Sequence, residues 1–394
     1  MLGTRVDEID APRLIRSTHG WWFLGNQTWT LLKSEQVLQD GTICAEIEEF
    51  LHSHGAYRPR IPSAYTLTVL PTTTCNLGCG YCFQNTGLDP AGGNKPQRID
   101  GYRLDTATID RIAHFTESQM ERAGLRSLDL VVFGGEPLLN PRGCLALLQH
   151  CGTIGLRSAV MTTNGVLLTP TIAKNLNAAG LSGVQVTFDG SREDHDRIRV
   201  TRNGGATFDT IVRNVARATD VTTLSWGLRV NISHHNFDRI GEVFAQWKEH
   251  LDPGRCTVSF AWVGDAGFGY GNDLRHVDEV SQKFVEWQVM ALECGFRITR
   301  PGMKTTCHTC SAPGGKYGAV VNADGTLYSC WQSAGKDGFE VGTLDDGYLT
   351  ADRVSDRWVQ CGYEYDQAPT EVVADFHDRV DGQVLDYLYA TGRL

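Results

Sequence analysis

The sequence lacks any apolar run close to the roughly 20 residues that a membrane-spanning helix needs, and it has no long basic run. Its 36 Lys and Arg side chains are outnumbered by 46 Asp and Glu, which gives a net charge of −10. This balance offers little electrostatic support for binding nucleic acid or an anionic membrane surface. The N-terminal residues also lack the apolar stretch of a secretory signal. We therefore expect a cytoplasmic protein without nucleic-acid or membrane partners.

Cysteine, by contrast, is abundant, with 12 in 394 residues. In a reducing compartment such a number indicates metal or redox chemistry rather than disulfides. Seven of them fall into two sets, which are Cys75, Cys79 and Cys82, and then Cys307, Cys310, Cys330 and Cys361. We interpret most of the other five as small buried hydrophobic side chains.

The chain divides by pattern into three zones, and we predict domains at residues 1–62, 63–300 and 301–394. In the first zone, Trp21–Leu24 and Thr28–Leu32 flank a short connection with a glycine, which predicts a β-hairpin. A helical pattern follows it. We expect this extension either to bind a peptide by adding a strand to its edge or to cap the second domain.

In the second zone, strand-like and helix-like segments alternate. The predicted strands are Thr66–Leu70, Leu128–Phe133, Ser158–Thr162, Gly183–Phe188, Leu224–Ile232 and Thr257–Val263. The predicted helices lie near residues 105–123, 142–153, 170–179, 208–218 and 237–250. Such repeats predict an α/β fold with a parallel sheet and right-handed crossovers. Six units suit an open, partial (β/α)6 TIM-like barrel better than a closed eight-fold one, and a small β-hairpin domain follows it.

The first cysteine set, Cys75, Cys79 and Cys82, follows the first predicted strand with the spacing C-x3-C-x2-C. Three thiolates on one short loop can bind three irons of a [4Fe–4S] cluster and leave the fourth iron without a protein ligand. An amine and a carboxylate of a small molecule can chelate that iron. The alternative is structural zinc, which requires a fourth Cys or His, and none lies close in the sequence.

Polar turn sequences follow the next three predicted strands in order. They are Gly134–Pro137, Thr162–Gly165 and Thr187–Gly190. Each of them alone is a common turn sequence. Because the carboxyl ends of strands in a β/α barrel meet at one rim, where functional groups gather, we expect these segments to lie beside the cysteine loop.

With Tyr81 in the aromatic position of C-x3-C-x-aromatic-C, the loop resembles the signature of the radical S-adenosylmethionine (SAM) superfamily. The resemblance implies that SAM binds the open iron and is cleaved reductively to a 5′-deoxyadenosyl radical, which abstracts hydrogen from a substrate. It assigns SAM contacts to Tyr81, Gly134, Gly135, Glu136, Asn164, Thr187, Asp189, Arg199 and Asn231. Among these, the Gly134–Glu136 segment would meet the amino group and Arg199 the carboxylate. The alternative for Arg199 is a solvated helix face.

The second cysteine set resembles the C-terminal extensions called SPASM and Twitch domains, which bind auxiliary [4Fe–4S] clusters. The further cysteine run of a full SPASM domain is missing, since only Cys361 follows Cys330. The resemblance therefore implies the shorter Twitch type, with one auxiliary cluster on Cys307, Cys310, Cys330 and Cys361. Four cysteines with a C-x2-C pair also suit zinc, so that alternative stays open.

The resemblance covers roughly residues 63–362 and is closest to enzymes that mature ribosomally made peptides and to anaerobic sulfatase-maturing enzymes. It implies a precursor peptide that is crosslinked or oxidised after hydrogen abstraction, with flavodoxin or ferredoxin as electron donor. The alternatives are a small-molecule radical SAM dehydrogenase and a non-enzymatic iron–sulfur or zinc protein. Asp265, just after the sixth strand, is the candidate catalytic residue.

Overall fold

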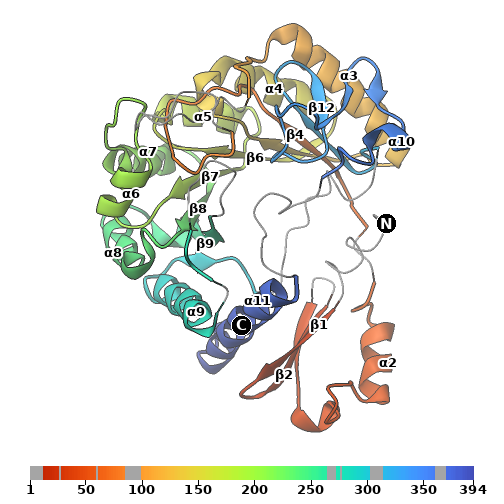
Figure 1. Cartoon of the computed structure of the whole chain (residues 1–394), viewed down its shortest axis with the longest axis vertical. Helices are drawn as coiled ribbons and strands as arrows, with labels where there is room; N and C mark the ends of the chain where they lie inside the picture. Colours follow the sequence, from red (N-terminus) through yellow and green to blue (C-terminus); the bar gives the residue numbers. More distant parts are fainter. Residues whose placement is uncertain are drawn as a thin grey trace.

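The computed structural model describes most of the chain, whose strands form two β-sheets with helices packed around them (Figure 1). The described residues are 12–25, 28–58, 61–84, 99–263, 272–275, 277–301, 314–359 and 370–394. The predicted site residues Asp265, Cys307, Cys310 and Cys361 lie outside these ranges. Within them, no helix has both the length and the apolar character that crossing a bilayer requires.

Parallel strands that follow one another along the chain make up most of the larger sheet, in the order β10-β9-β8-β7-β6-β5-β4. The strands are β4 (Tyr65–Val69), β5 (Leu128–Val132), β6 (Leu156–Thr163), β7 (Gly183–Phe188), β8 (Ser225–Ile232), β9 (Cys256–Trp262) and β10 (Arg297–Ile298). Parallel neighbours need crossover connections. Helices provide them, namely α3 (Thr106–Ala123), α4 (Pro141–Thr153), α5 (Pro170–Ala178), α6 (Arg192–Ile198), α7 (Phe208–Val221), α8 (Glu242–Lys248) and α9 (Asp278–Glu293).

These helices begin and end where local side chains satisfy their free backbone groups. Asn140 accepts from the Gly143 N–H at 3.2 Å, and Thr169 accepts from the Ile172 N–H at 3.3 Å. In both cases a proline holds the first helical position, where its missing N–H costs nothing. At the end of α3, Gly124 adopts a left-handed φ of 67°, which glycine accepts without strain. Short 3-10 helices lie at Ser34–Gln36, Pro137–Leu139, Phe237–Arg239 and Pro253–Arg255.

The sheet curves, and its helices lie on the outer face, as Figure 1 shows for β4 to β9. Buried side chains such as Leu130, Val186, Leu228 and Trp247 fill the space between the sheet and these helices. The predicted partial β/α barrel is therefore confirmed. The six predicted strands differ from the observed ones by no more than two residues at either end.

The C-terminal zone extends the same sheet on its other side. β11 (Gly318–Val321) pairs parallel with β4, although about 250 residues separate them in the sequence. β12 (Thr326–Tyr328), β13 (Glu340–Thr343) and β14 (Gly347–Tyr348) then continue it antiparallel. The β-hairpin predicted after the barrel is confirmed, since β11 and β12 pair antiparallel. Gly325 lies in the turn between them and has a φ of 91°. A short helix, α10 (Ala351–Val354), follows.

The N-terminal sheet has three antiparallel strands, β1 (Arg13–Ser17), β2 (Gly20–Gly25) and β3 (Thr28–Leu32), and is followed by α2 (Ala45–Ser53). The sequence predicted β2, β3 and α2 but missed β1. The last helix, α11 (Thr370–Ala390), lies between this sheet and α9 (Figure 1). It thereby connects the N-terminal sheet to the barrel.

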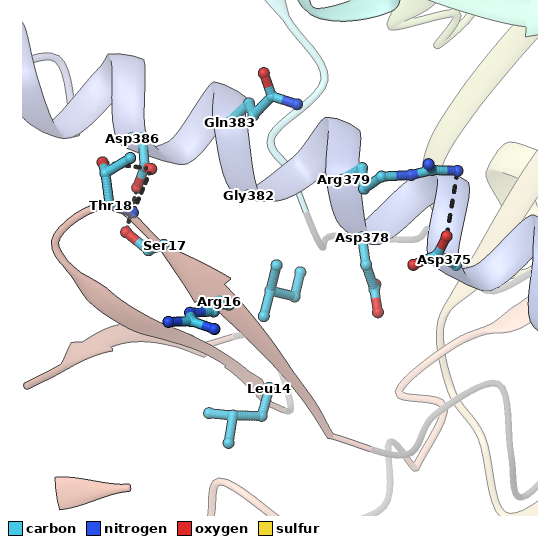
Figure 2. A pocket seen from close by; sticks show the side chains of 11 residues that line it. Leu14, Arg16, Ser17, Thr18, Asp375, Asp378, Arg379, Gly382, Gln383 and Asp386 are labelled. Atoms are coloured by element: carbon cyan, nitrogen blue, oxygen red, sulfur yellow. Dashed lines mark hydrogen bonds and ion pairs between the residues drawn. The ribbon is translucent and has the colours of Figure 1, made fainter. Parts of the chain in front are cut away.

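Polar contacts fix α11 against β1 and β2. Arg13 pairs with Asp378 and with Asp381, and the Trp22 indole N–H donates to Asp386 at 2.7 Å. Between helix and strand lies a cleft of about 530 Å³, shown in Figure 2. Gly382 lies in it where an added Cβ would come within 2.8 Å of the Ile15 side chain, which would have to move to make room.

Candidate functional site

The loop of Cys75, Cys79 and Cys82 begins a few residues after β4, at the carboxyl ends of the parallel strands. Its base is fixed because the Thr73 hydroxyl donates to the Asp100 carbonyl at 2.6 Å. Its middle is fixed to the segment after α6. There the Gly78 N–H donates to the Val200 carbonyl at 3.0 Å, and Nε of Arg202 donates to the Cys75 carbonyl at 2.7 Å.

The three thiols lie close enough to influence one another's ionisation. Burial raises the pKa of Cys75, and Glu136 and the other two cysteines raise it further. Burial also raises the pKa of Cys79 to about 12, although Arg199 opposes the shift. Thiols with raised pKa values ionise and act as ligands only where a positively charged centre stabilises the thiolate form.

Hydrogen-bond donors point at the Cys75 sulfur. The Leu77 N–H lies 3.4 Å from Sγ, and Nδ2 of Asn164 lies 3.8 Å from it. Donors to the ligating sulfurs are one of the means by which proteins tune iron–sulfur clusters, so this donor set fits a thiolate-bound cluster. Among the described residues, no three His, Cys, Asp or Glu side chains surround a position for a single metal ion.

The Gly134–Glu136 segment lies directly against the residues that lead into the cysteine loop. The Gly135 N–H donates to the Thr72 carbonyl at 3.1 Å, and the Glu136 N–H donates to the Thr74 carbonyl at 2.8 Å. A Cβ on Gly135 would come within 2.2 Å of the Thr74 carbonyl oxygen. Only glycine permits two backbones to approach this closely.

The Glu136 carboxylate is fully buried and bonded within the protein. It accepts hydrogen bonds from the Leu138 N–H at 2.9 Å, the Thr163 hydroxyl at 2.6 Å and the Asn164 N–H at 2.7 Å. Burial raises its pKa, and the bonds from Thr163 and Asn164 oppose that shift. Glu136 thus joins the turns after β5 and β6. Asn164, in the second of these turns, also donates to Asn76 at 2.8 Å.

A second network joins the cysteine loop to β8, to the turn after β7 and to the end of α6. The Tyr81 hydroxyl donates to Oδ2 of Asp189 at 2.9 Å and accepts from Nη2 of Arg199 at 2.6 Å and from Nδ2 of Asn231 at 3.0 Å. Arg229 orients Asn231 through a bond of 2.9 Å to Oδ1. Four residues assigned by resemblance therefore lie together.

An ion pair is at the centre of this network. Nε of Arg199 lies 2.9 Å from Oδ2 of Asp189, and the two side chains are 9% and 2% exposed. Burial raises the pKa of Asp189, and the Arg199 guanidinium opposes that shift. Burial lowers the pKa of Arg199, but Tyr81, Cys79 and Asp189 together raise it by more, so its pKa lies above the usual value. Arg199 is buried, not on a solvated helix face.

Of the other predicted contacts, Thr187 is buried at 8% exposure in β7. The sequence did not identify Arg202, which holds the carbonyl of Cys75. In the sequence, Arg202 is marked only by its position three residues after Arg199. That position does not show whether the side chain binds the cysteine loop or faces solvent.

The second cysteine set is described only at Cys330, which is 1% exposed and follows β12. Its neighbour Trp331 contacts Phe83, the residue after Cys82, with ring centroids 5.4 Å apart, and Phe133 at 4.9 Å. Aromatic side chains therefore connect the segment after Cys82 with the segment after Cys330.

The chain is similar in sequence to a known family and to several characterised proteins. Residues 69–246 match the family model described as the Radical SAM superfamily. The AdoMet-dependent heme synthase of Methanosarcina barkeri (strain Fusaro / DSM 804) is 35% identical over 130 residues, which are 32% of this chain and 32% of that protein. The mycofactocin maturase MftC of Mycolicibacterium smegmatis (strain ATCC 700084 / mc(2)155) is 24% identical over 271 residues, or 66% and 62% of the two chains. The chain thus spans about a third of the first relative's length.

Solved structures share the fold. The native anSMEcpe structure with bound AdoMet has a TM-score of 0.61 at 16% identity and covers 83% of this chain and 98% of that one. The structure of Streptococcus suis SuiB bound to its precursor peptide SuiA has a TM-score of 0.52 at 12% identity, with 89% and 90% covered.

Proposed function

Residues 69–246 form a radical SAM domain, and on this premise we propose that the chain cleaves SAM reductively and abstracts hydrogen from a ribosomally made peptide. One observation carries the proposal. The loop of Cys75, Cys79 and Cys82 contacts the buried Arg199–Asp189 pair through Tyr81. A thiolate set and a guanidinium that suits a carboxylate therefore lie side by side at the carboxyl ends of the strands.

In this proposal the three cysteines bind a [4Fe–4S] cluster, which supplies the electron for SAM cleavage when it is bound. The Leu77 and Asn164 donors hold the Cys75 sulfur. Arg199 binds the SAM carboxylate with a charge-assisted hydrogen bond, and the Gly134–Glu136 segment approaches the amino group. The remaining assigned contacts to SAM are Tyr81, Asn164, Thr187, Asp189 and Asn231.

We propose that Cys307, Cys310, Cys330 and Cys361 bind one auxiliary [4Fe–4S] cluster in a domain at residues 301–394, next to a barrel domain at 63–300. The burial of Cys330 beside Trp331 supports this position. A flavodoxin or ferredoxin would supply electrons in the cytoplasm, and Asp265 is the candidate catalytic residue. Iron counting on anaerobically purified protein tests the auxiliary cluster, since two clusters give about eight irons and one gives about four. Cys330→Ser should lower the count by about four.

Three observations support a peptide substrate. MftC is named as a maturase, and SuiB was solved with its precursor peptide. In addition, the N-terminal sheet within residues 1–62 has β3 at its edge, where an extended peptide can add a strand. A small-molecule substrate is the second candidate, and the similarity to the heme synthase favours it.

The substrate test uses the reconstituted, reduced enzyme, SAM and a precursor peptide encoded beside its gene. A loss of two hydrogen masses from the peptide supports the proposal. Transfer of deuterium from a deuterated peptide into 5′-deoxyadenosine would identify the peptide as the hydrogen source. If SAM is cleaved but no peptide is changed, the small-molecule candidate is favoured.

A further inference from the structure

A buried histidine lies behind the Arg199–Asp189 pair and contacts the backbone that carries it. His195 has no exposed surface. Its Nδ1 lies 3.3 Å from the backbone nitrogen of Asp189, and its Nε2 lies 3.0 Å from the Thr207 hydroxyl oxygen. Thr207 in turn donates to the backbone carbonyl of Arg199 at 2.7 Å. One imidazole and one hydroxyl thus connect the backbones of both members of the ion pair.

The hydrogen bonds define the tautomer of this histidine. The Thr207 hydroxyl has one hydrogen, and it is used in the bond to the Arg199 carbonyl. The hydroxyl oxygen must therefore accept from Nε2, so Nε2 carries the hydrogen and Nδ1 accepts from the Asp189 N–H. Burial lowers the pKa of His195, and the nearby Arg199 charge lowers it further, in agreement with a neutral ring.

The surroundings hold both groups in place. The His195 ring packs against Phe188 and Phe208, with centroids 5.4 and 5.5 Å away. Asp196 accepts from the backbone N–H groups of Thr207 at 2.8 Å and Phe208 at 2.9 Å. Both His195 and Thr207 are buried, so neither interacts with solvent. A buried polar pair is favourable only when its hydrogen bonds are satisfied, as they are here.

We propose that His195 and Thr207 are positioning residues, which set the spacing of Asp189 and Arg199 and thereby the affinity for the carboxylate of SAM. The inference rests on the proposed function, because that function assigns the carboxylate to Arg199. His195 does not touch the reacting atoms. It acts through the Asp189 backbone, and Thr207 acts through the Arg199 backbone.

Two pairs of variants separate positioning from packing. Thr207→Val keeps the shape but removes the hydroxyl, whereas Thr207→Ser keeps the hydroxyl. His195→Asn keeps an acceptor at the place of Nδ1 but loses the bond to Thr207, whereas His195→Gln can keep a donor at the place of Nε2. We expect Thr207→Val and His195→Asn to raise the Kd for SAM at least tenfold with unchanged iron content, and Thr207→Ser to stay within twofold of wild type.

The readouts are SAM binding by isothermal titration calorimetry on anaerobic, cluster-loaded protein, and iron content. Wild-type affinity in Thr207→Val and His195→Asn would overturn the inference alone. A wild-type protein that loads its cluster but binds no SAM would overturn the proposed function as well. Should those variants not fold, the wild type still gives a test by ¹⁵N NMR of labelled histidine. We expect His195 to be neutral with hydrogen on Nε2 at pH 7, and a hydrogen on Nδ1 would contradict the proposal.

Discussion

Nε of Arg199 donates to Oδ2 of Asp189 at 2.9 Å in a position where both side chains are buried. A buried ion pair is costly to assemble, because its desolvation offsets much of its attraction. Tyr81 bonds to both residues, so the pair is connected to the loop of the three cysteines. These bonds hold the Arg199 guanidinium in a fixed position beside the loop of the three cysteines. Recognition of a carboxylate next to that loop requires a guanidinium held in this way.

The first prediction concerns this guanidinium. Arg199→Lys keeps the charge but lacks the planar guanidinium, whose Nε and Nη2 donate to Asp189 and Tyr81 at the same time. We expect the Kd for SAM to rise about 10-fold to 100-fold, the range that corresponds to one charged hydrogen bond, with iron content unchanged. Arg197→Lys is the control, since Arg197 lies on the same segment with its side chain 68% exposed. Equal affinity of the two variants would contradict the role assigned to Arg199.

The second prediction concerns the close approach at Gly135. In Gly135→Ala the new Cβ would meet the carbonyl oxygens of Thr74 at 2.2 Å and of Thr73 at 2.4 Å. We expect displacement of the cysteine loop, with loss of iron and a lower melting temperature. Gly152→Ala is the control, because no atom lies within 4 Å of its added Cβ. There alanine should stabilise α4 by up to about 1 kcal/mol. Unchanged iron content in Gly135→Ala would show that the loop tolerates the shift.

The sequence predicted the parts of the fold whose signals are local. The helix near residues 142–153 and the cysteine loop have signals that depend on neighbours in the chain, and the structure has both where the sequence predicted them. The strand β1 was missed because Arg13–Ser17 is short and carries two arginines, and it becomes a strand through pairing with β2 and α11. The pairing of β11 with β4 joins distant segments, for which no local pattern exists.

The candidate site was predictable to the same extent. Resemblance assigned Glu136 and Arg199 to ligand contacts, and the structure places both next to the cysteine loop. It could not indicate that the Glu136 carboxylate bonds Thr163 and the Asn164 backbone, or that Arg199 pairs with Asp189. Those partners depend on how neighbouring strands align, which residue order alone does not specify.

The third prediction concerns the contact between the N-terminal sheet and α11. Asp386 accepts hydrogen bonds from the Trp22 indole at 2.7 Å and from the Thr18 N–H at 3.0 Å. In Asp386→Ala both donors lose their acceptor. We expect amide hydrogen exchange in β1 and β2 to accelerate at least tenfold, on the order of the loss of one charged hydrogen bond, without change in β4 to β9. Gln383→Ala, in the same cleft (Figure 2), is the control.

If exchange in β1 and β2 stays slow in Asp386→Ala, the apolar contacts of Ile15 and Trp22 with Leu385 hold the sheet by themselves. The predicted contribution of Asp386 would then be wrong.

The fourth prediction concerns pH. Burial lowers the pKa of His195 well below 6.5, so below pH 6.5 the unfolded chain takes up a proton at His195 that the folded protein does not. The free energy of unfolding therefore falls with falling pH, by up to about 1.4 kcal/mol per pH unit from this residue. Above pH 6.5 the residue contributes no slope. Urea unfolding between pH 5.5 and 7.5, followed by circular dichroism, measures the slope.

His195→Asn removes the titrating ring, so its stability should fall less steeply with decreasing pH, by the equivalent of about one proton. The contributions of the other histidines are common to both proteins and cancel in the difference. Parallel slopes for the variant and the wild type would mean that the folded protein protonates His195 as readily as the unfolded chain does.

The most direct test of the account is SAM cleavage by the reduced protein. Anaerobically reconstituted wild type, Cys79→Ser and Cys294→Ser are each incubated with SAM and dithionite, and 5′-deoxyadenosine is measured by liquid chromatography and mass spectrometry. Cys294 is a half-buried cysteine outside both sets. The account predicts 5′-deoxyadenosine from the wild type and from Cys294→Ser, and none from Cys79→Ser. Intact SAM with the wild type, or equal cleavage by Cys79→Ser, would contradict it.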